Sequence, residues 1–144
     1  MTYPRSPYDQ VDGLYYFARM LDKIRLRETG KLPADYIPYL EKGVNQRLCD
    51  YLHIDYRELV ERVKAGGTDE EILAWAYEEG RRLTEVECLI WNEFSRKRGW
   101  NDAASEMLGQ FKQSSGLSDR DDVQTMFDYY DADEGRPLFH RVSA

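Results

Sequence analysis

Cysteine and long apolar runs are scarce in this 144-residue sequence, and each scarcity excludes a class of protein. No stretch approaches the roughly 18 consecutive apolar residues of a membrane helix, so we expect no membrane association. The opening MTYPRSPYDQ contains no apolar run of the kind that a secretory signal needs. The two cysteines, Cys49 and Cys88, are therefore expected to be reduced thiols rather than a disulfide, in a cytoplasmic protein.

Positive charge is also in deficit. The chain has 20 Lys and Arg residues against 27 Asp and Glu residues, which gives a net charge of −7 and a pI near 4.9. Such a chain is not attracted to nucleic acid or to an anionic membrane, so the expected partners are proteins or small molecules. Hydrophobic residues make up 42% of the sequence and eleven residues are tyrosines, which excludes a disordered chain. The length fits one domain with a core of its own.

Motifs that specify a reaction are absent as well. Lys64-Ala-Gly-Gly-Thr68 lacks the spacing of a phosphate-binding loop, and the acidic residues 119–134 lack the pattern of a calcium loop. Asp119–Asp122 are interpreted as first-turn residues of a helix. Cys49 and His53 have a spacing that suits two metal ligands on a helix, but two ligands do not make a site, even with His140 in the tail. We predict no metal, no cofactor and no identifiable catalytic residue.

The sequence does contain a series of helix signals. Apolar residues recur at helical spacing, and two capping boxes, Thr68–Glu71 and Thr84–Glu87, mark helix starts. Helices are predicted at about 12–28, 41–52, 55–66, 68–80, 84–99, 101–113 and 119–133. No segment has the alternation of a strand, and prolines interrupt residues 31–40. The prediction is all-α: a single domain of residues 1–144 with an irregular (orthogonal) bundle of six to seven short helices. Residues 1–10 are expected to be an extended arm and residues 135–144 a tail.

The first predicted helix departs from the acidic average. Residues 1–31 carry six basic and four acidic side chains, a net charge of +2, whereas the rest of the chain carries −9. Asp22 lies three residues from both Arg19 and Arg25, and Lys23 shares a helix face with Arg19. In one interpretation Arg19, Asp22, Lys23 and Arg25 form an anion site, with Asp22 orienting guanidiniums toward a phosphate or carboxylate. In the other, the basic face docks against the acidic C-terminal helix.

Aromatic residues give a further expectation. Tyr15-Tyr16 and Tyr129-Tyr130 are adjacent pairs, and neighbouring helix positions diverge by about 100°. One member of each pair should therefore face a second element, a groove or a partner. Trp75, Trp91 and Trp100 lie on or beside apolar stripes and are expected to pack in the core.

Several segments resemble a known family. PRSP, GLYYFARMLDKIRLRETGKL, YLHIDYRELVERVKAGGTDEEILAW and DRDDVQTMFDYYDADEGR are similar to the bacterial proteins grouped as domain of unknown function 5069, over about residues 4–136. The resemblance implies a small bacterial cytosolic protein and implies no known activity or catalytic residues. His53 stands where such sequences usually have a glycine, which indicates an exposed position at a helix C-terminus.

Two classes of function follow from these observations, and the sequence leaves the choice and the oligomeric state open. The first is a non-catalytic cytosolic binding or interaction protein with an unknown protein partner, or one that forms homo-oligomers, and it should expose an apolar or tyrosine patch. The alternative is a small-anion-binding protein or enzyme with a site beside the first helix. That site requires Arg19, Lys23 and Arg25 to converge on a concave space with an unpaired guanidinium.

Overall fold

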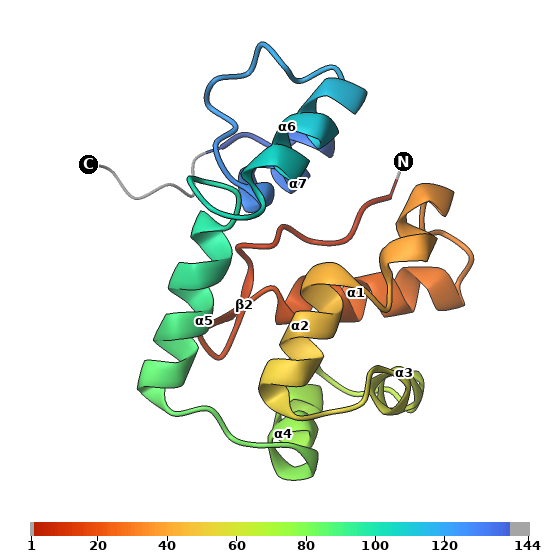
Figure 1. Ribbon diagram of the computed structural model, residues 1–144. Coiled ribbons are helices and arrows are strands. Elements are labelled where there is room, and N and C mark those ends of the chain that lie inside the picture. Colours follow the sequence, from red (N-terminus) through yellow and green to blue (C-terminus); the bar gives the residue numbers. More distant parts are fainter. Residues whose placement is uncertain (1, 139–144) are drawn as a thin grey trace.

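The polypeptide forms short helices packed around the first of them, in a computed structural model that describes residues 2–138 (Figure 1). In chain order the elements are β1 (Gln10–Val11), β2 (Leu14–Tyr15), α1 (Phe17–Glu28), the 3-10 helix η1 (Ala34–Tyr39), α2 (Gly43–Leu52), α3 (Tyr56–Lys64), α4 (Asp69–Glu79), α5 (Glu85–Lys97), α6 (Ser105–Ser114) and α7 (Met126–Asp133). The predicted all-α class is confirmed, since the only sheet in the described part of the chain is a two-stranded hairpin. His140 and most of the expected tail lie outside the described residues.

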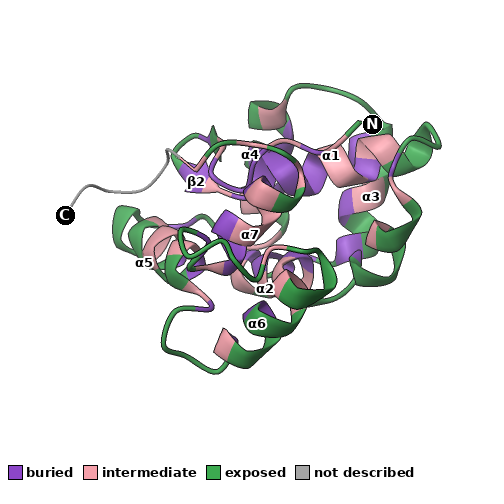
Figure 2. Ribbon diagram, turned by 90° about the horizontal axis from the view of Figure 1, so that it is seen from above, coloured by how far each residue is buried: buried purple, intermediate pink, exposed green. Residues whose placement is uncertain are grey.

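Helix α1 lies in the middle of the fold because its apolar stripe is covered on several sides (Figure 1). Phe17, Met20, Leu21 and Ile24 are each at most 2% exposed. Helices α3 and α4 pack against α1, while α5 packs against β2 and α7. Figure 2 shows the buried residues gathered in the interior, with exposed residues on the outer helix faces. Burial of each large apolar side chain contributes about 1.5–3 kcal/mol, so this stripe anchors the helix.

Helix α1 starts later than its sequence predicts. It begins at Phe17 rather than Asp12, because Asp12 and Gly13 adopt positive φ angles of 48° and 83° and form the turn between β1 and β2. The hairpin pairs Gln10 with Tyr15 in antiparallel register. The expectation that no segment forms a strand is therefore wrong for these few residues, whose turn chemistry outweighs the helical pattern.

Helix α7 also starts later, at Met126 rather than Asp119. Thr125 is its N-cap, and the Thr125 hydroxyl accepts a hydrogen bond from the backbone N–H of Asp128 at 3.1 Å. The preceding residues form turns in which Arg120 pairs with Asp122 at 2.8 Å. The interpretation of Asp119–Asp122 as first-turn residues is wrong because the effective cap lies further along the chain.

Helix α6 begins at Ser105 rather than near Asn101, whereas two other helices start at their predicted signals. Both predicted capping boxes are confirmed, with Thr68 and Thr84 accepting from the backbone N–H of Glu71 and Glu87 at 3.1 and 3.2 Å. His53 ends α2 in the left-handed conformation, with φ 59° and ψ 42°, and is exposed. This is the C-terminal position expected for His53, where glycine is free of strain.

The N-terminal arm is extended and packs into the structure. The Arg5 backbone N–H donates to Asp22 of α1 at 2.9 Å, and the Ser6 hydroxyl donates to Asp131 of α7 at 3.0 Å. Ser6 is 4% exposed, so the second bond is buried. The arm therefore links α1 to α7 at a point where the two helices build the site described below.

Gly80 provides a test of the packing between α4 and the end of α2. A Cβ atom at Gly80 would lie 1.9 Å from the carbonyl oxygen of Leu52 and 2.8 Å from that of His53. Gly80→Ala should lower the free energy of unfolding in urea by about 3 kcal/mol or more, because backbone must move. Gly109→Ala in α6 is the control, since its Cβ meets nothing within 4 Å. It should raise stability by about 0.5–1 kcal/mol, and equal effects of the two substitutions would refute the close approach.

Candidate functional site

A pocket of about 420 Å³ opens where α1, η1, α2, the end of α5, α6 and α7 meet. This volume is in the range of small-molecule sites. Its cationic lining residues are Arg19, Lys23, Lys42, Arg47 and Arg98. Its acidic lining residues are Asp35, Asp133 and Glu134, and five tyrosines also line it: Tyr16, Tyr36, Tyr39, Tyr129 and Tyr130. Cations thus outnumber carboxylates here, in a chain whose net charge is −7.

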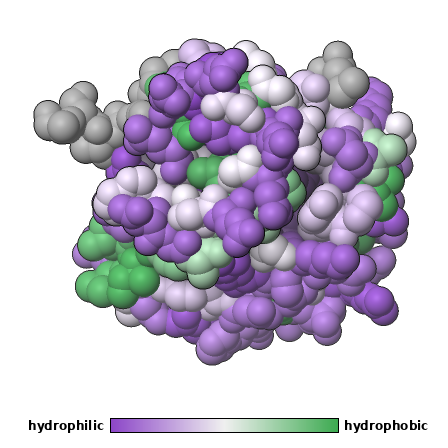
Figure 3. Space-filling view, turned by 45° about the horizontal axis from the view of Figure 1, so that its top comes forward, coloured by the Kyte–Doolittle hydropathy of each residue, from purple (hydrophilic) through white to green (hydrophobic). Residues whose placement is uncertain are grey.

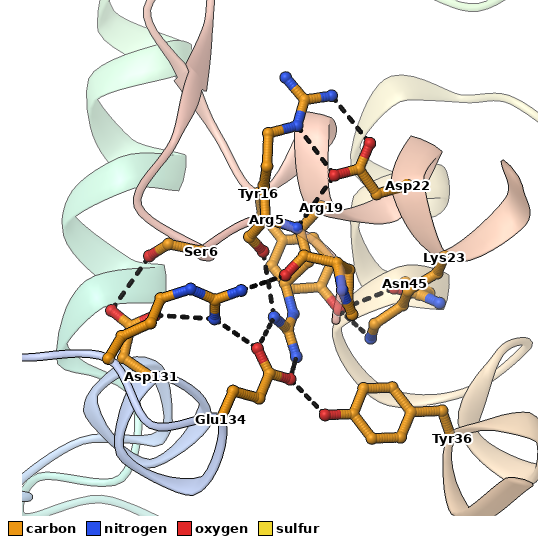
Figure 4. A network of polar contacts seen from close by, with 12 residues as sticks. Arg5, Ser6, Tyr16, Arg19, Asp22, Lys23, Tyr36, Asn45, Asp131 and Glu134 are labelled. Carbon is orange, nitrogen blue, oxygen red and sulfur yellow. Dashed lines mark hydrogen bonds and ion pairs between the residues drawn. The ribbon is translucent and has the colours of Figure 1, made fainter. Parts of the chain in front are cut away.

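Arg19 and Glu134 form a buried ion pair at one wall of the pocket (Figure 4). The two guanidinium Nη atoms donate to the two carboxylate oxygens at 2.8 and 2.6 Å, and Arg19 is 2% exposed. Tyr36 and Arg136 also donate to Glu134. Burial opposes ionisation of Glu134, but the hydrogen bonds from Arg19 outweigh it and hold the pKa of Glu134 below its ordinary value. The charge of Arg19 is therefore already neutralised within the protein.

Asp22 and Arg25 belong to a different network. Arg5 donates two hydrogen bonds to Asp22 at 2.8 and 2.9 Å, and both Arg5 and Arg25 pair with Asp69 at 2.8 Å. None of these residues lines the pocket. Of the four residues that the sequence grouped as an anion site, Arg19 and Lys23 face the pocket, whereas Asp22 and Arg25 tie α1 to the arm and to α4.

Lys23 lies in the pocket without an acidic partner. Its Nζ donates to the Tyr16 hydroxyl at 2.8 Å, and no carboxylate of the described residues lies within ion-pair distance of it. The Tyr16 hydroxyl in turn donates to Oδ1 of Asn45 at 2.7 Å (Figure 4). Burial, and then the nearby charge of Arg19, lower the pKa of Lys23 well below its ordinary value. Lys23 is thus a pocket amine whose hydrogen-bond partner is a phenol rather than a carboxylate.

Arg47 and Arg98 both approach the ring of Phe94. Each guanidinium carbon lies 5.7 Å from the centroid of the Phe94 ring, within the range of a cation–π contact. The Arg47 guanidinium makes no ion pair within residues 2–138, and Arg98 has an acidic partner, Asp102, only at 3.9 Å. Burial, followed by the charge of Arg98, lowers the pKa of Arg47. Two guanidiniums with little neutralisation therefore border the pocket.

No pattern in the sequence indicates that Arg47 and Arg98 lie close together. Arg98 is at the C-terminus of α5, where a cation complements the helix dipole, and Arg47 is an isolated arginine on α2. They come together only because α2 and α5 pack around the same space. Spacing along one helix could identify Arg19 and Lys23, but it carries no information about partners on other helices.

The first turn of α2 adds positive potential to the pocket. Gly43 and Val44 line the pocket, and the N-cap residue Lys42 forms no side-chain cap. The first turn of α2 also contains no acidic residue. The partial positive charge of a helix N-terminus, about half an elementary charge, is therefore not offset by a carboxylate of the helix itself.

The apolar part of the lining is aromatic. Phe111 stacks on Tyr129 with ring centroids 5.6 Å apart, and Tyr16 stacks on Phe127 at 5.9 Å. Tyr16, Tyr129 and Tyr130 all line the pocket. Tyr15 and Tyr16 precede α1 rather than lying within it, so the helical divergence expected for that pair does not apply. Trp100, by contrast, is 57% exposed, so its expected core packing is wrong, while Trp91 is buried.

Ser95 and Arg19 leave polar atoms without partners in this lining. Ser95 Oγ and Arg19 Nε are buried and form no hydrogen bond to any part of the chain between residues 2 and 138. Unsatisfied buried polar atoms cost about 1–3 kcal/mol each, so they are uncommon away from functional sites. A ligand with polar atoms could satisfy them.

Other kinds of site find no support in the structure. Within residues 2–138 there is no group of three His, Cys, Asp or Glu side chains that could hold a metal ion. Cys49 and Cys88 are both free thiols, and burial raises the pKa of Cys49 to about 12, so its thiol is unreactive. None of the described helices combines the length and apolar character needed to cross a membrane.

The buried pair yields a stability prediction. Glu134→Gln should lower the free energy of unfolding near neutral pH by about 3 kcal/mol, because Arg19 would remain buried without its counter-charge. Glu41→Gln is the control: Glu41 pairs with Arg57 at 3.4 Å on the surface, and its loss should cost at most about 1 kcal/mol. Urea denaturation measures both, and equal effects would show that the pair is not buried in solution.

The same variant has a defined pH dependence. The pKa of Glu134 is depressed in the folded state, so the ionised Glu134 carboxylate stabilises the folded protein. This contribution to the free energy of unfolding is fully present above pH 4.5, the ordinary pKa of the group, and is lost as the pH falls through the lower pKa of the folded state. The stability difference between wild type and Glu134→Gln should therefore be constant at neutral pH and shrink only in acid.

Comparison with known proteins agrees with the resemblance read from the sequence. The profile of one protein family, described as "Domain of unknown function (DUF5069)", matches residues 1–136. A search of curated proteins finds no match. The match spans almost the whole chain, and the chain therefore belongs to the DUF5069 family.

Proposed function

We propose that the protein binds a small anionic molecule in the pocket beside α1. The observation that carries this proposal is that Arg47 and Arg98 line the pocket while, among residues 2–138, Arg47 pairs with no carboxylate and Arg98 only with Asp102 at 3.9 Å. Desolvated cations without counter-charges are unfavourable, and a bound anion would remove that cost. A surface that served only for internal ion pairs would have neutralised these groups as Glu134 neutralises Arg19.

Arg47 and Arg98 are the groups that would hold the acidic head of the ligand. Their charges repel each other, which the lowered pKa of Arg47 reflects after burial. A carboxylate or phosphate between two guanidiniums relieves this repulsion and accepts charge-assisted hydrogen bonds. The first turn of α2, next to Lys42, favours an anion in the same part of the pocket.

The rest of the pocket suits an apolar or aromatic body. Tyr39, Phe111, Tyr129 and Met107 provide flat and adaptable apolar surface. A ligand of this kind would combine an acidic head with a compact planar body, within a volume of about 420 Å³.

A cytoplasmic site of action is part of the same proposal. Cys88 is a partly exposed free thiol and Cys49 is a buried one. Cysteines that remain free thiols are typical of proteins in a reducing compartment, which supports a cytoplasmic location.

The exposed face of α5 favours a second candidate, association with another protein. Val86, Leu89, Ile90 and Phe94 follow helical spacing and are 45–62% exposed. Figure 3 shows a hydrophobic patch at the lower left, on the side where α5 lies in Figure 1. A second copy of the chain is the simplest occupant, because two-fold dimers are the commonest assemblies.

The anion site can be tested with a matched pair of probes. 1-Naphthyl phosphate should bind in isothermal titration calorimetry, whereas 1-naphthol, which lacks the charge, should bind at least about tenfold more weakly. Arg47→Gln should weaken binding of 1-naphthyl phosphate by about tenfold or more, since a hydrogen bond to a charged group contributes about 1.5–3 kcal/mol.

Arg57→Gln is the control, because Arg57 is 85% exposed and does not line this pocket. It should leave the affinity unchanged. The anion site would be refuted if the two probes bound with equal affinity. It would also be refuted if Arg47→Gln and Arg57→Gln weakened the binding of 1-naphthyl phosphate equally. Stability of each variant should be checked by thermal melting so that unfolding is not mistaken for lost binding.

Association through α5 predicts a concentration-dependent dimer in sedimentation velocity. Ile90→Glu should shift the equilibrium to monomer, since a charge cannot be buried without a partner. Ile37→Glu is the matched control on η1, as Ile37 is 42% exposed and lies outside the α5 face. A wild-type chain that remains monomeric at the highest measurable concentration would exclude this interface between copies.

A further inference from the structure

Lys23 is held by a chain of hydrogen bonds that leaves its nitrogen lone pair unused. The side-chain amide of Asn45 donates to the Leu40 carbonyl at 3.0 Å, which fixes Oδ1 as the atom that faces Tyr16. The Tyr16 hydroxyl gives its proton to that Oδ1 at 2.7 Å. The Tyr16 oxygen can then only accept from Lys23, at 2.8 Å (Figure 4). One N–H of Lys23 is thereby oriented, and the lone pair of the uncharged amine is left for another group.

The surroundings favour that uncharged form. Burial is the larger cause and the nearby charge of Arg19 the smaller cause that together lower the pKa of Lys23 well below its ordinary value. Tyr16 does not become a counter-anion, because burial raises the pKa of its phenol well above its ordinary value. A desolvated lysine beside another cation is the arrangement that makes a primary amine nucleophilic at neutral pH.

We propose that Lys23 forms a Schiff base with the carbonyl group of a small aldehyde or ketone that also carries a carboxylate or phosphate. The inference rests on the proposed anion site, since Arg47 and Arg98 would select the acidic group while Lys23 reacts with the carbonyl carbon. All three residues line the same pocket. The proposed ligand is therefore more specific than an anion with an apolar body, because it also carries an aldehyde or ketone group.

The covalent step balances without any co-reactant. The Lys23 lone pair forms a bond to the carbonyl carbon as the C=O π pair moves to oxygen. One proton moves from nitrogen to oxygen to give the carbinolamine, and a second proton, from solvent water, reaches the same oxygen. Water then departs as the nitrogen lone pair forms the C=N bond, and the nitrogen keeps its remaining proton. In the protonated imine the single N–H can keep its hydrogen bond to Tyr16, so the contact that orients the free amine also orients the product.

Reductive trapping tests this proposal on the full chain. The protein is incubated with 4-carboxybenzaldehyde and sodium cyanoborohydride, and labelled lysines are located by peptide mass spectrometry. Lys23 should be labelled at least about tenfold faster than any other lysine, because its lowered pKa leaves a larger fraction of the amine unprotonated. Benzaldehyde, which has no acidic group, should label Lys23 more slowly.

Two variants complete the experiment. Lys23→Met should abolish the fast labelling phase, while Lys31→Met, at an exposed position outside the pocket, should retain it. Labelling spread evenly over surface lysines in the wild type would overturn the Schiff base, and this readout does not depend on whether Lys23→Met folds.

The outcomes separate the two proposals. Binding of 1-naphthyl phosphate without preferential trapping at Lys23 would overturn the Schiff base and leave the anion site standing. Preferential trapping that is equally fast with benzaldehyde would overturn the proposed ligand class and the role of Arg47 and Arg98 together.

Discussion

The buried ion pair between Arg19 and Glu134 is the contact on which the pocket depends. It joins residues 115 positions apart in the chain and brings η1 into the same cluster through Tyr36. A buried pair of this kind is not in itself a strong source of stability, because desolvation of both charges offsets most of their attraction. Its effect here is positional. It places the end of α7 against α1, and since neither charge can be left alone in the interior, the wall of the pocket cannot shift far without unfolding.

That pairing also determines which charges of α1 remain available. Arg19 is neutralised by Glu134, and Arg25 and Asp22 are engaged with Arg5 and Asp69 on another side of the helix. Successive helix positions diverge by about 100°, so residues close in sequence reach different neighbours. Lys23 faces the pocket with only a phenol as its partner. In the proposed site, Lys23, whose pKa is lowered, and the two guanidiniums of Arg47 and Arg98 have complementary roles: the guanidiniums bind an acidic group while the Lys23 amine reacts with a carbonyl group.

The sequence predicts most helix boundaries in this fold, because capping boxes and glycine stops are local signals. It fails where a competing local signal is subtler, as at the Asp12-Gly13 turn before α1 and at the Thr125 cap of α7. The candidate site is only half predictable. Arg19 and Lys23 stand out by spacing on one helix, whereas the pairing of Arg25 with Asp69 and the approach of Arg47 to Arg98 are products of tertiary packing. No pattern within a single segment carries that information.

The charge state of Lys23 tests this picture most directly. In protein labelled with ¹³C at the lysine Cε, a pH titration followed by NMR reports the pKa of every lysine, and Lys23→Arg assigns the resonance. We expect Lys23 to titrate well below the ordinary lysine value of 10.5. If Lys23 titrates at or above that value, then it is neither desolvated nor influenced by Arg19, and the pocket does not have the electrostatic character described above.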